Sequence, residues 1–315
     1  MTRFAFGTFA AGDGVPFPGL VVDERVHDLR PRFADTLSML HEWDASLRAL
    51  SELASSPPGE GVALDELRPL PPVHPSGQVL CGGANYYKHL RQMVVAHLRR
   101  EGDTRPEEEL RAEAVEVAAR RSREEDPFVF AGLPSALCGA RADVVLWGPG
   151  REHDWELELA VVLARGGRDI AEADAMSHVA GYTMSNDIST RDVMFRPGFP
   201  MTDFLMTKMR PTFFPTGPYI VPAEFVPDYR ALRITLKVGG EVMQDEGIDD
   251  IIYGVEQLVA YASRVVELLP GDLLLTGSPA GNAAHHGGRW LVPGDVMEGE
   301  ITGLGVQVNR CVAPS

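Results

Sequence analysis

Acidic and apolar residues alternate from Asp154 to Glu158, and an apolar run from Leu159 to Leu163 follows directly. Because successive side chains of a β-strand point to opposite faces of the sheet, the pattern predicts a strand with Asp154, Glu156 and Glu158 on one face. Adjacent carboxylates repel each other unless a cation lies between them, and oxygen ligands suit Mg²⁺, Mn²⁺ or Ca²⁺. The same alternation is typical of a solvated strand face, so this segment alone leaves both interpretations open.

The composition argues against several classes of protein. The 315 residues include 29 Lys and Arg against 45 Asp and Glu, and the resulting formal charge of −16 disfavours a nucleic-acid partner. The hydrophobic fraction of 44% can form a substantial core, but no apolar run reaches the length of a membrane span. The first residues lack the pattern of a signal peptide, and the three cysteines are widely scattered. We therefore expect a cytoplasmic protein with reduced thiols.

Three later segments carry polar residues that suit an active site. They read GYTMSNDISTRD at residues 181–192, KMRPTFFPTGPY at residues 208–219 and LPGDLLLTGSPAG at residues 269–281. In this order and with these spacings, they and the acidic strand resemble the fumarylacetoacetate hydrolase family, from about Val79 to the C-terminus. The resemblance implies an α+β, mainly β chain with a small N-terminal domain over residues 1–72. A mixed β-roll catalytic domain with peripheral helices would follow over residues 73–315, and a homodimer is expected.

Local patterns agree with a mainly β chain. Strand-like runs at residues 4–9 and 19–22 precede a helical stretch at residues 33–54. Residues 236–243 contain a Gly-Gly pair between apolar runs, which predicts a β-hairpin. Residues 252–269 have the apolar spacing of an amphipathic helix. The pattern therefore favours an antiparallel β-core with a few helices.

A long helical segment is predicted at residues 86–126. One helix is expected at residues 86–100, and a second, rich in Ala, Glu and Arg, should follow the N-cap-like Thr104 and end near Arg123. This segment is longer than the corresponding part of the family that the chain resembles. It precedes the acidic strand, so we interpret it as an enlarged lid over the site, with an oligomer contact as the alternative.

The resemblance implies a metal site made of carboxylates. The family binds its metal through two glutamates of the acidic strand and the aspartate of an Asn-Asp motif. In this sequence the corresponding residues are Glu156, Glu158 and Asp187. Mg²⁺ is the expected ion, Mn²⁺ prefers the same ligands and Ca²⁺ is possible. Asp154 is expected outside the ligand set, and Arg191 and Asp192 are expected to pair with each other and fix the loop that carries Asp187.

Four further residues are assigned to the site by the same resemblance. His89 follows an Asn-Tyr pair at a short spacing and corresponds to the family's general base, a task that suits a side chain titrating near neutral pH. Lys208 corresponds to a lysine that binds a carboxylate or a developing enolate, although a lysine can also simply pair with surface acids. Thr276 and Tyr182 are expected to contact the substrate.

The sequence departs from the family pattern at three positions. Many relatives have a glutamate three residues after the histidine, where this chain has Gln92, which can orient an imidazole but cannot stabilise its charged form. His89 would then be a weaker base, unless Glu101 or the acids at residues 107–109 reach it. Leu133 replaces a common lysine and Met194 a common glutamine. Both changes predict a substrate with less negative charge or a larger apolar part.

The expected reaction follows from the family. The resemblance implies a divalent-metal-dependent hydrolase that cleaves a C–C bond in a 2,4-dioxo acid such as an acylpyruvate, through a metal-bound enolate. The same site would also serve decarboxylation of a β-keto acid, enol–keto isomerisation or hydration. A catalytically silent binding protein is a third interpretation, but such a protein has no need of buried carboxylates that repel each other. The expected partner is a small keto acid.

Overall fold

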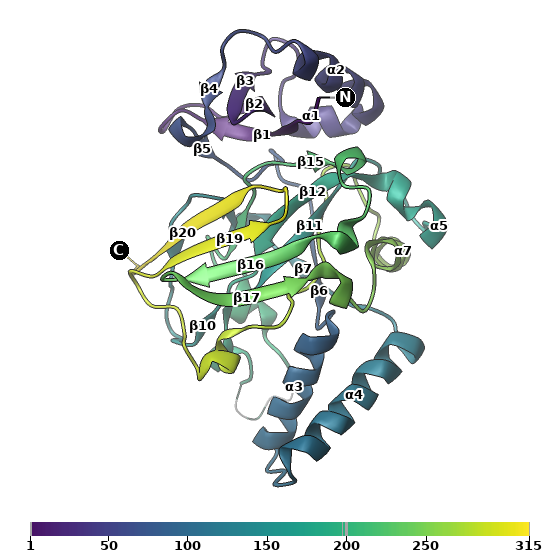
Figure 1. Ribbon diagram of the computed structural model, residues 1–315, viewed down its shortest axis with the longest axis vertical. Coiled ribbons are helices and arrows are strands. Elements are labelled where there is room, and N and C mark those ends of the chain that lie inside the picture. The colour runs from purple at the N-terminus through teal and green to yellow at the C-terminus, as the bar shows by residue number, and fades with distance from the viewer. Residues whose placement is uncertain (1, 197, 199–200, 315) are drawn as a thin grey trace.

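The N-terminal part of the chain forms a small antiparallel sheet covered by two helices. The computed structural model describes residues 2–196, 198 and 201–314. The sheet has the order β4-β3-β2-β1-β5, and its strands are β1 (Ala5–Ala10), β2 (Phe17–Val22), β3 (Arg25–Asp28), β4 (Val62–Ala63) and β5 (Arg68–Pro69). The predicted helical stretch is divided into α1 (Thr36–His41) and α2 (Trp43–Ser55), and the Asp35 side chain caps α1 by accepting from the Ser38 N–H. This unit occupies one end of the molecule (Figure 1).

A mixed central sheet carries the site. Its order is β7-β6-β18-β11-β12-β14-β8. The strands are β6 (Val79–Gly83), β7 (Phe128–Gly132), β8 (Leu137–Gly139), β11 (Leu157–Leu163), β12 (Val179–Asn186), β14 (Phe214–Thr216) and β18 (Leu273–Leu275), with β15 (Val221–Pro222) paired to β12. The β18–β6 and β14–β8 pairs are parallel, and the other pairs are antiparallel. The boundary at residue 72 stays a prediction.

A second large sheet packs near the first and closes the core. Its order is β17-β16-β19-β20-β9, with strands β9 (Val144–Val145), β16 (Arg233–Val238), β17 (Glu241–Gly247), β19 (Val296–Ile301) and β20 (Val306–Val312). Leu157 and Leu159 of β11 and Ile234 and Leu236 of β16 belong to one buried cluster. The predicted hairpin is the β16–β17 pair, and the predicted helix at 252–269 is the shorter α7 (Val255–Val265). The mainly β architecture with peripheral helices is confirmed.

The predicted acidic strand is interrupted. His153–Asp154 forms β10, which pairs with β13 (Ser189–Thr190), and β11 begins only at Leu157. Beyond the interruption the period of two holds. Glu158, Ala160 and Val162 lie on one face of β11, where Ala160 and Val162 pack with Phe6 of the N-terminal unit. One face of β11 therefore has Glu158 near its start, and further along it has Ala160 and Val162, which pack against the N-terminal unit.

The long helical segment forms an antiparallel pair of helices. α3 (Tyr87–Arg100) and α4 (Glu107–Glu124) project from the end of the molecule opposite the N-terminal unit (Figure 1). Leu90, Leu110 and Ala114 are buried, so the two helices share an apolar seam. Only the base of the pair, with His89 in the first turns of α3, lies beside the central sheet. Two further helices are short: α5 (Glu172–Ala175) and α6 (Phe204–Lys208).

Candidate active site

Three carboxylates converge where β11 begins and β12 ends. The antiparallel register sets Leu157 opposite Asn186, so Glu156 just before β11 and Asp187 just after β12 are neighbours. The Asp187 N–H donates to the Glu156 carbonyl at 2.9 Å. Carboxylate oxygens of Glu156, Glu158 and Asp187 lie within 4.8 Å of one another, and all three residues are buried. The structure therefore brings together the three residues expected to bind a metal.

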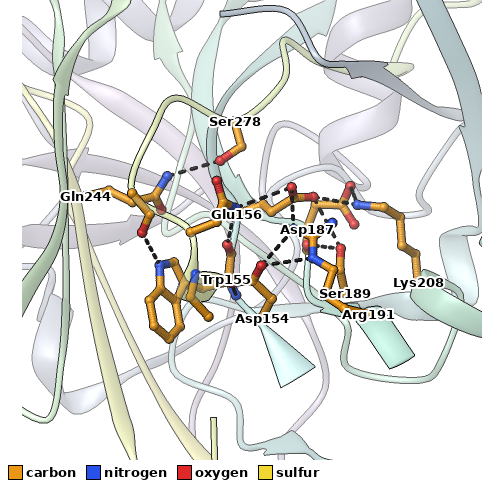
Figure 2. A network of polar contacts seen from close by, with 12 residues as sticks. Asp154, Trp155, Glu156, Asp187, Ser189, Arg191, Lys208, Gln244 and Ser278 are labelled. Carbon is orange, nitrogen blue, oxygen red and sulfur yellow. Dashed lines mark hydrogen bonds and ion pairs between the residues drawn. The ribbon is translucent and has the colours of Figure 1, made fainter. Parts of the chain in front are cut away.

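Two buried cations contact this cluster. Lys208, the last residue of α6, donates from Nζ to Glu156 Oε2 at 2.5 Å and to Asp187 Oδ2 at 2.6 Å (Figure 2). Arg191 donates from Nη2 to Glu156 Oε1 at 2.8 Å and from Nε to Asp154 Oδ2 at 2.9 Å. Four carboxylates thus face two cations, which leaves a buried excess of two negative charges. One divalent ion would neutralise that excess.

Orphaned acceptors in the cluster fit a metal ion. Asp187 Oδ1 is buried and has no hydrogen-bond partner among the described residues. Glu158 accepts one hydrogen bond, at 2.8 Å from the Gly277 N–H, and forms no ion pair within the described part of the chain. Oxygen-only donors of this kind suit Mg²⁺ or Mn²⁺ better than softer ions. The residues present therefore fit a divalent cation held by Glu156, Glu158 and Asp187.

The environment separates the pKa values of the three acids. Burial favours the neutral form of Glu156, but attraction to Arg191 and Lys208 outweighs it and lowers the pKa of this carboxyl below its usual range. Burial raises the pKa of Asp187 to about 6, although Lys208 opposes the shift. Burial, with repulsion from Asp187 and Glu156, raises the pKa of Glu158 well above its ordinary value. A proton on Glu158 therefore competes with a metal ion.

His89 stands beside the cluster without a carboxylate partner. Asn85 fixes the start of α3, because its side-chain amide donates to the Thr276 and Tyr253 carbonyls and its oxygen accepts from the Tyr253 N–H. Burial lowers the pKa of His89 to about 4, although Glu156 opposes the shift. The Nδ1 atom is buried and lacks a hydrogen-bond partner among the described residues. The imidazole is therefore neutral at pH 7.

The acids suggested as substitutes for the missing glutamate lie elsewhere. Glu107 pairs with Arg99 and Arg111, on the projecting part of the helical pair. Gln92 lines a different groove of α3, and its buried Oε1 has no partner in the described part of the chain. No hydrogen bond between described residues orients His89 from a charged group. His89 therefore has no charged hydrogen-bond partner among the described residues.

A cavity of about 270 Å³ opens over the cluster. Its charged and titratable lining comprises His89, Glu156, Glu158, Asp187, Arg191 and Lys208. Most of the remaining wall is apolar or backbone, and includes Met194 where many relatives have glutamine. A volume near 300 Å³ corresponds to the small end of ligand pockets, so the cavity suits a small organic acid.

The structure corrects one predicted substrate contact, that of Tyr182. Tyr182 pairs with Val161, an odd number of residues from the Glu158–Ser185 pair, and so points to the opposite face of the sheet. There it packs 6.1 Å from the Tyr229 ring, inside the core. The Thr276 hydroxyl lies 3.5 Å from the Tyr86 hydroxyl, and Thr276 does not line the cavity among the described residues. Tyr182 therefore points away from the carboxylates, whereas a contact of Thr276 with the substrate stays a prediction.

Two further expectations change. Arg191 and Asp192 do not pair with each other: Arg191 holds Asp154 and Glu156, while Asp192 accepts from the Arg151 and Glu152 N–H groups. Leu133 follows β7 and is not part of the described cavity lining. The contribution of Arg191 to the cluster was missed because its partner, Asp154, is 37 residues away. An arginine four residues after an Asn-Asp motif, in a chain with an acidic strand upstream, is the signal that could have indicated it.

Comparison with known proteins assigns the fold and site to a family. The model of the fumarylacetoacetate (FAA) hydrolase C-terminal domain matches residues 78–312. The chain belongs to the fumarylacetoacetate hydrolase family. It is 34% identical over 244 residues to the mitochondrial oxaloacetate tautomerase FAHD2A of Bos taurus, which covers 77% of this chain and 69% of the relative.

Solved structures of the family share the architecture. A probable 2-hydroxyhepta-2,4-diene-1,7-dioate isomerase from Mycobacterium abscessus is 27% identical with a TM-score of 0.73, covering 99% of both chains. Maleylpyruvate hydrolase from Sphingobium, solved with manganese(II) and pyruvate, is 22% identical with a TM-score of 0.75, covering 99% of this chain and 100% of the other. The second likeness is one of fold. Family members of this kind are enzymes that act on small molecules. No helix in the described part of this chain is long and apolar enough to cross a bilayer.

Proposed function

We propose that this protein is a divalent-metal-dependent enzyme that interconverts the enol and keto forms of a 2-oxo acid. The observation that carries the proposal is the environment of His89, which lines the cavity as a neutral imidazole with no hydrogen-bonded carboxylate among the described residues, so that burial outweighs the attraction of Glu156 for its charged form. Hydrolysis requires a base that takes a proton from water and holds it as imidazolium while the carbonyl is attacked. Tautomerisation starts from an enol, whose O–H is already acidic, and needs only a proton relay to carbon.

Each residue of the site has a part in this reaction. Glu156, Glu158 and Asp187 would hold the ion, which when bound polarises the 2-oxo group and orients the acid. Lys208 keeps Glu156 and Asp187 ionised and adds positive charge where the enolate oxygen develops negative charge. His89 accepts the enol O–H proton at one ring nitrogen and donates a proton from the ring to the carbon next to the oxo group, so that it ends as the neutral imidazole with which it began. The names of the bovine and mycobacterial relatives, a tautomerase and an isomerase, agree with this class.

Hydrolysis of an acylpyruvate is the second candidate. The same carboxylate cluster, lysine and histidine would serve it, and the Sphingobium relative is named a hydrolase. The Gln92 side chain disfavours it, because a neutral amide cannot compensate an imidazolium. Magnesium as the natural ion, a homodimer and a cytoplasmic location stay predictions.

The decisive experiment compares the two reactions in one preparation. Enol-to-keto conversion of several 2-oxo acids is followed by ultraviolet absorbance, and cleavage of acetylpyruvate by mass spectrometry, both with Mg²⁺ or Mn²⁺. We expect rapid tautomerisation, little cleavage, and loss of the activity in Glu156→Gln and His89→Asn. The matched control is His97→Asn, since His97 is exposed near the end of α3 and does not line the cavity. Cleavage faster than tautomerisation would overturn the proposal in favour of a hydrolase.

A further inference from the structure

Aromatic and thioether side chains form most of the side-chain wall of the cavity. The Phe130 and Phe204 rings stack with centroids 4.6 Å apart and an interplanar angle of 24°, and Phe128 lies 6.1 Å from Phe204. The apolar wall consists of Met93, Phe128, Phe130, Met194, Phe195 and Phe204. Three of these side chains also face solvent, since Met93, Phe128 and Phe195 are 44%, 47% and 46% exposed. An exposed apolar wall around a charged floor is typical of a binding surface for an amphipathic ligand.

The cations of the cavity are already engaged. Among the described lining residues only Lys208 and Arg191 carry positive charge. Lys208 binds two carboxylates and Arg191 binds two, and a bound divalent ion would only neutralise the remaining excess of negative charge. A carboxylate lying against Phe128, Phe130 and Phe204 would lose part of its water and gain no ion pair from the described lining residues; the nearby Arg100 lies on the Phe195 ring, 4.7 Å from its centroid. A phenyl or alkyl group at the same position would gain apolar burial.

We propose that the site selects monocarboxylic 2-oxo acids with an aryl or bulky alkyl tail and discriminates against dicarboxylic ones. The inference rests on the proposed function, which places the reacting carboxylate of the substrate beside the metal ligands and Lys208. It sets this chain apart from the three relatives described above, whose names each contain a dicarboxylate: oxaloacetate, a heptadiene-dioate and maleylpyruvate. The carboxylate-oxo end binds at the metal ligands, and the tail lies against the wall formed by Phe128, Phe130 and Phe204.

Phenylpyruvate and oxaloacetate form a matched pair of probes, since they differ in a phenyl against a carboxylate on the same carbon. We expect kcat/KM for enol-to-keto conversion of phenylpyruvate to exceed that for oxaloacetate by at least about tenfold. Phe128→Arg adds a cation to the wall at a half-exposed position of an edge strand, where the fold tolerates it. We expect this variant to shift the ratio toward oxaloacetate by about fivefold or more.

The matched control is Leu205→Arg. Leu205 is 69% exposed, follows Phe204 directly and does not line the cavity, so it adds the same charge nearby but outside the wall. Its ratio should equal that of the wild type. A wild-type enzyme that prefers oxaloacetate, or equal shifts in both arginine variants, would overturn the inference and leave the proposed tautomerase function standing.

Binding separates the two proposals if no acid is converted. Calorimetric titration of the Mn²⁺-loaded protein uses phenylglyoxylate and ketomalonate, which cannot enolise. Phenylglyoxylate binding at least about tenfold more tightly would support the substrate class while the absence of turnover refutes the tautomerase. Equal or tighter binding of ketomalonate would refute the substrate class, whatever reaction the enzyme performs.

Discussion

Replacing Glu158 by Gln should stabilise the metal-free protein while abolishing metal binding. Glu158 has no cation partner among the described residues, and burial with repulsion from Asp187 and Glu156 raises its pKa well above the unfolded value of 4.5. Such an acid destabilises the folded state above pH 4.5, because folding then requires uptake of a proton that the unfolded chain does not hold. A carboxylate that binds a metal ion destabilises the fold in this way once the ion is removed, because its counter-charge is lost. A structural acid keeps its partners in the metal-free protein.

The magnitude follows from the protonation cost. While the carboxyl stays protonated, each pH unit above 4.5 costs about 1.4 kcal/mol, so the gain from glutamine should grow as the pH rises from 4.5 toward the raised pKa. Glutamine is neutral and nearly isosteric, and its oxygen can keep the hydrogen bond from the Gly277 N–H. The Tm of the variant should therefore rise at pH 6.5, by about 1 to 2 °C for each kcal/mol gained in a chain of 315 residues. The gain should vanish as the pH falls toward 4.5.

The assay is thermal unfolding of chelator-treated protein at pH 4.5, 5.5 and 6.5, combined with Mn²⁺ titration. Asp272→Asn is the matched control, a second buried acid remote from the site. Asp272 Oδ1 accepts from the Gln78 backbone N–H, and Oδ2 accepts from the Leu269 N–H and from the Gln78 side-chain amide. The NH₂ group of an asparagine at this position would therefore face at least one of these donors. That variant should be destabilised. Equal destabilisation of both variants, or undiminished Mn²⁺ affinity of Glu158→Gln, would refute the reasoning.

Further predictions concern the metal, the base and the lysine. Because the pKa of Asp187 is raised to about 6 by burial, Mn²⁺ affinity should fall as the pH drops from 7 to 5, and calorimetry in buffers of different ionisation enthalpy should detect proton release. His89→Asn should lower kcat by about a hundredfold or more with unchanged Mn²⁺ affinity. Because the pKa of His89 is about 4, protonation of this residue should not reduce the wild-type rate at any pH above 6. Gln92→Glu should raise the pKa of His89 and increase any acylpyruvate cleavage seen by mass spectrometry. Lys208→Met should destabilise the metal-free protein by about 3 to 5 kcal/mol in thermal unfolding, and added Mn²⁺ should recover much of the loss.

Several features were accessible from the sequence because they depend on local periodicity. The two-residue period of a strand predicts that Glu158 and Ala160 share a face, and the structure has them there. The hairpin at 236–243 follows from a Gly-Gly turn between apolar runs, and Gly239 and Gly240 both adopt positive φ in the structure. The order of separated motifs indicated the family, which the comparison confirmed. The strand break before Leu157 was not predicted, because pairing with β13 ends β10 at Asp154.

The sequence by itself determined which carboxylates could share a site, since Glu156 and Glu158 follow from strand periodicity and Asp187 from a motif near the next strand. Only the tertiary structure decided what surrounds them. The register that turns Tyr182 into the core, the pairing of Arg191 with Asp154 and the stacking of Phe130 on Phe204 each join segments far apart in the chain. Such contacts depend on how whole strands and helices pack, and local propensity carries no information about that packing.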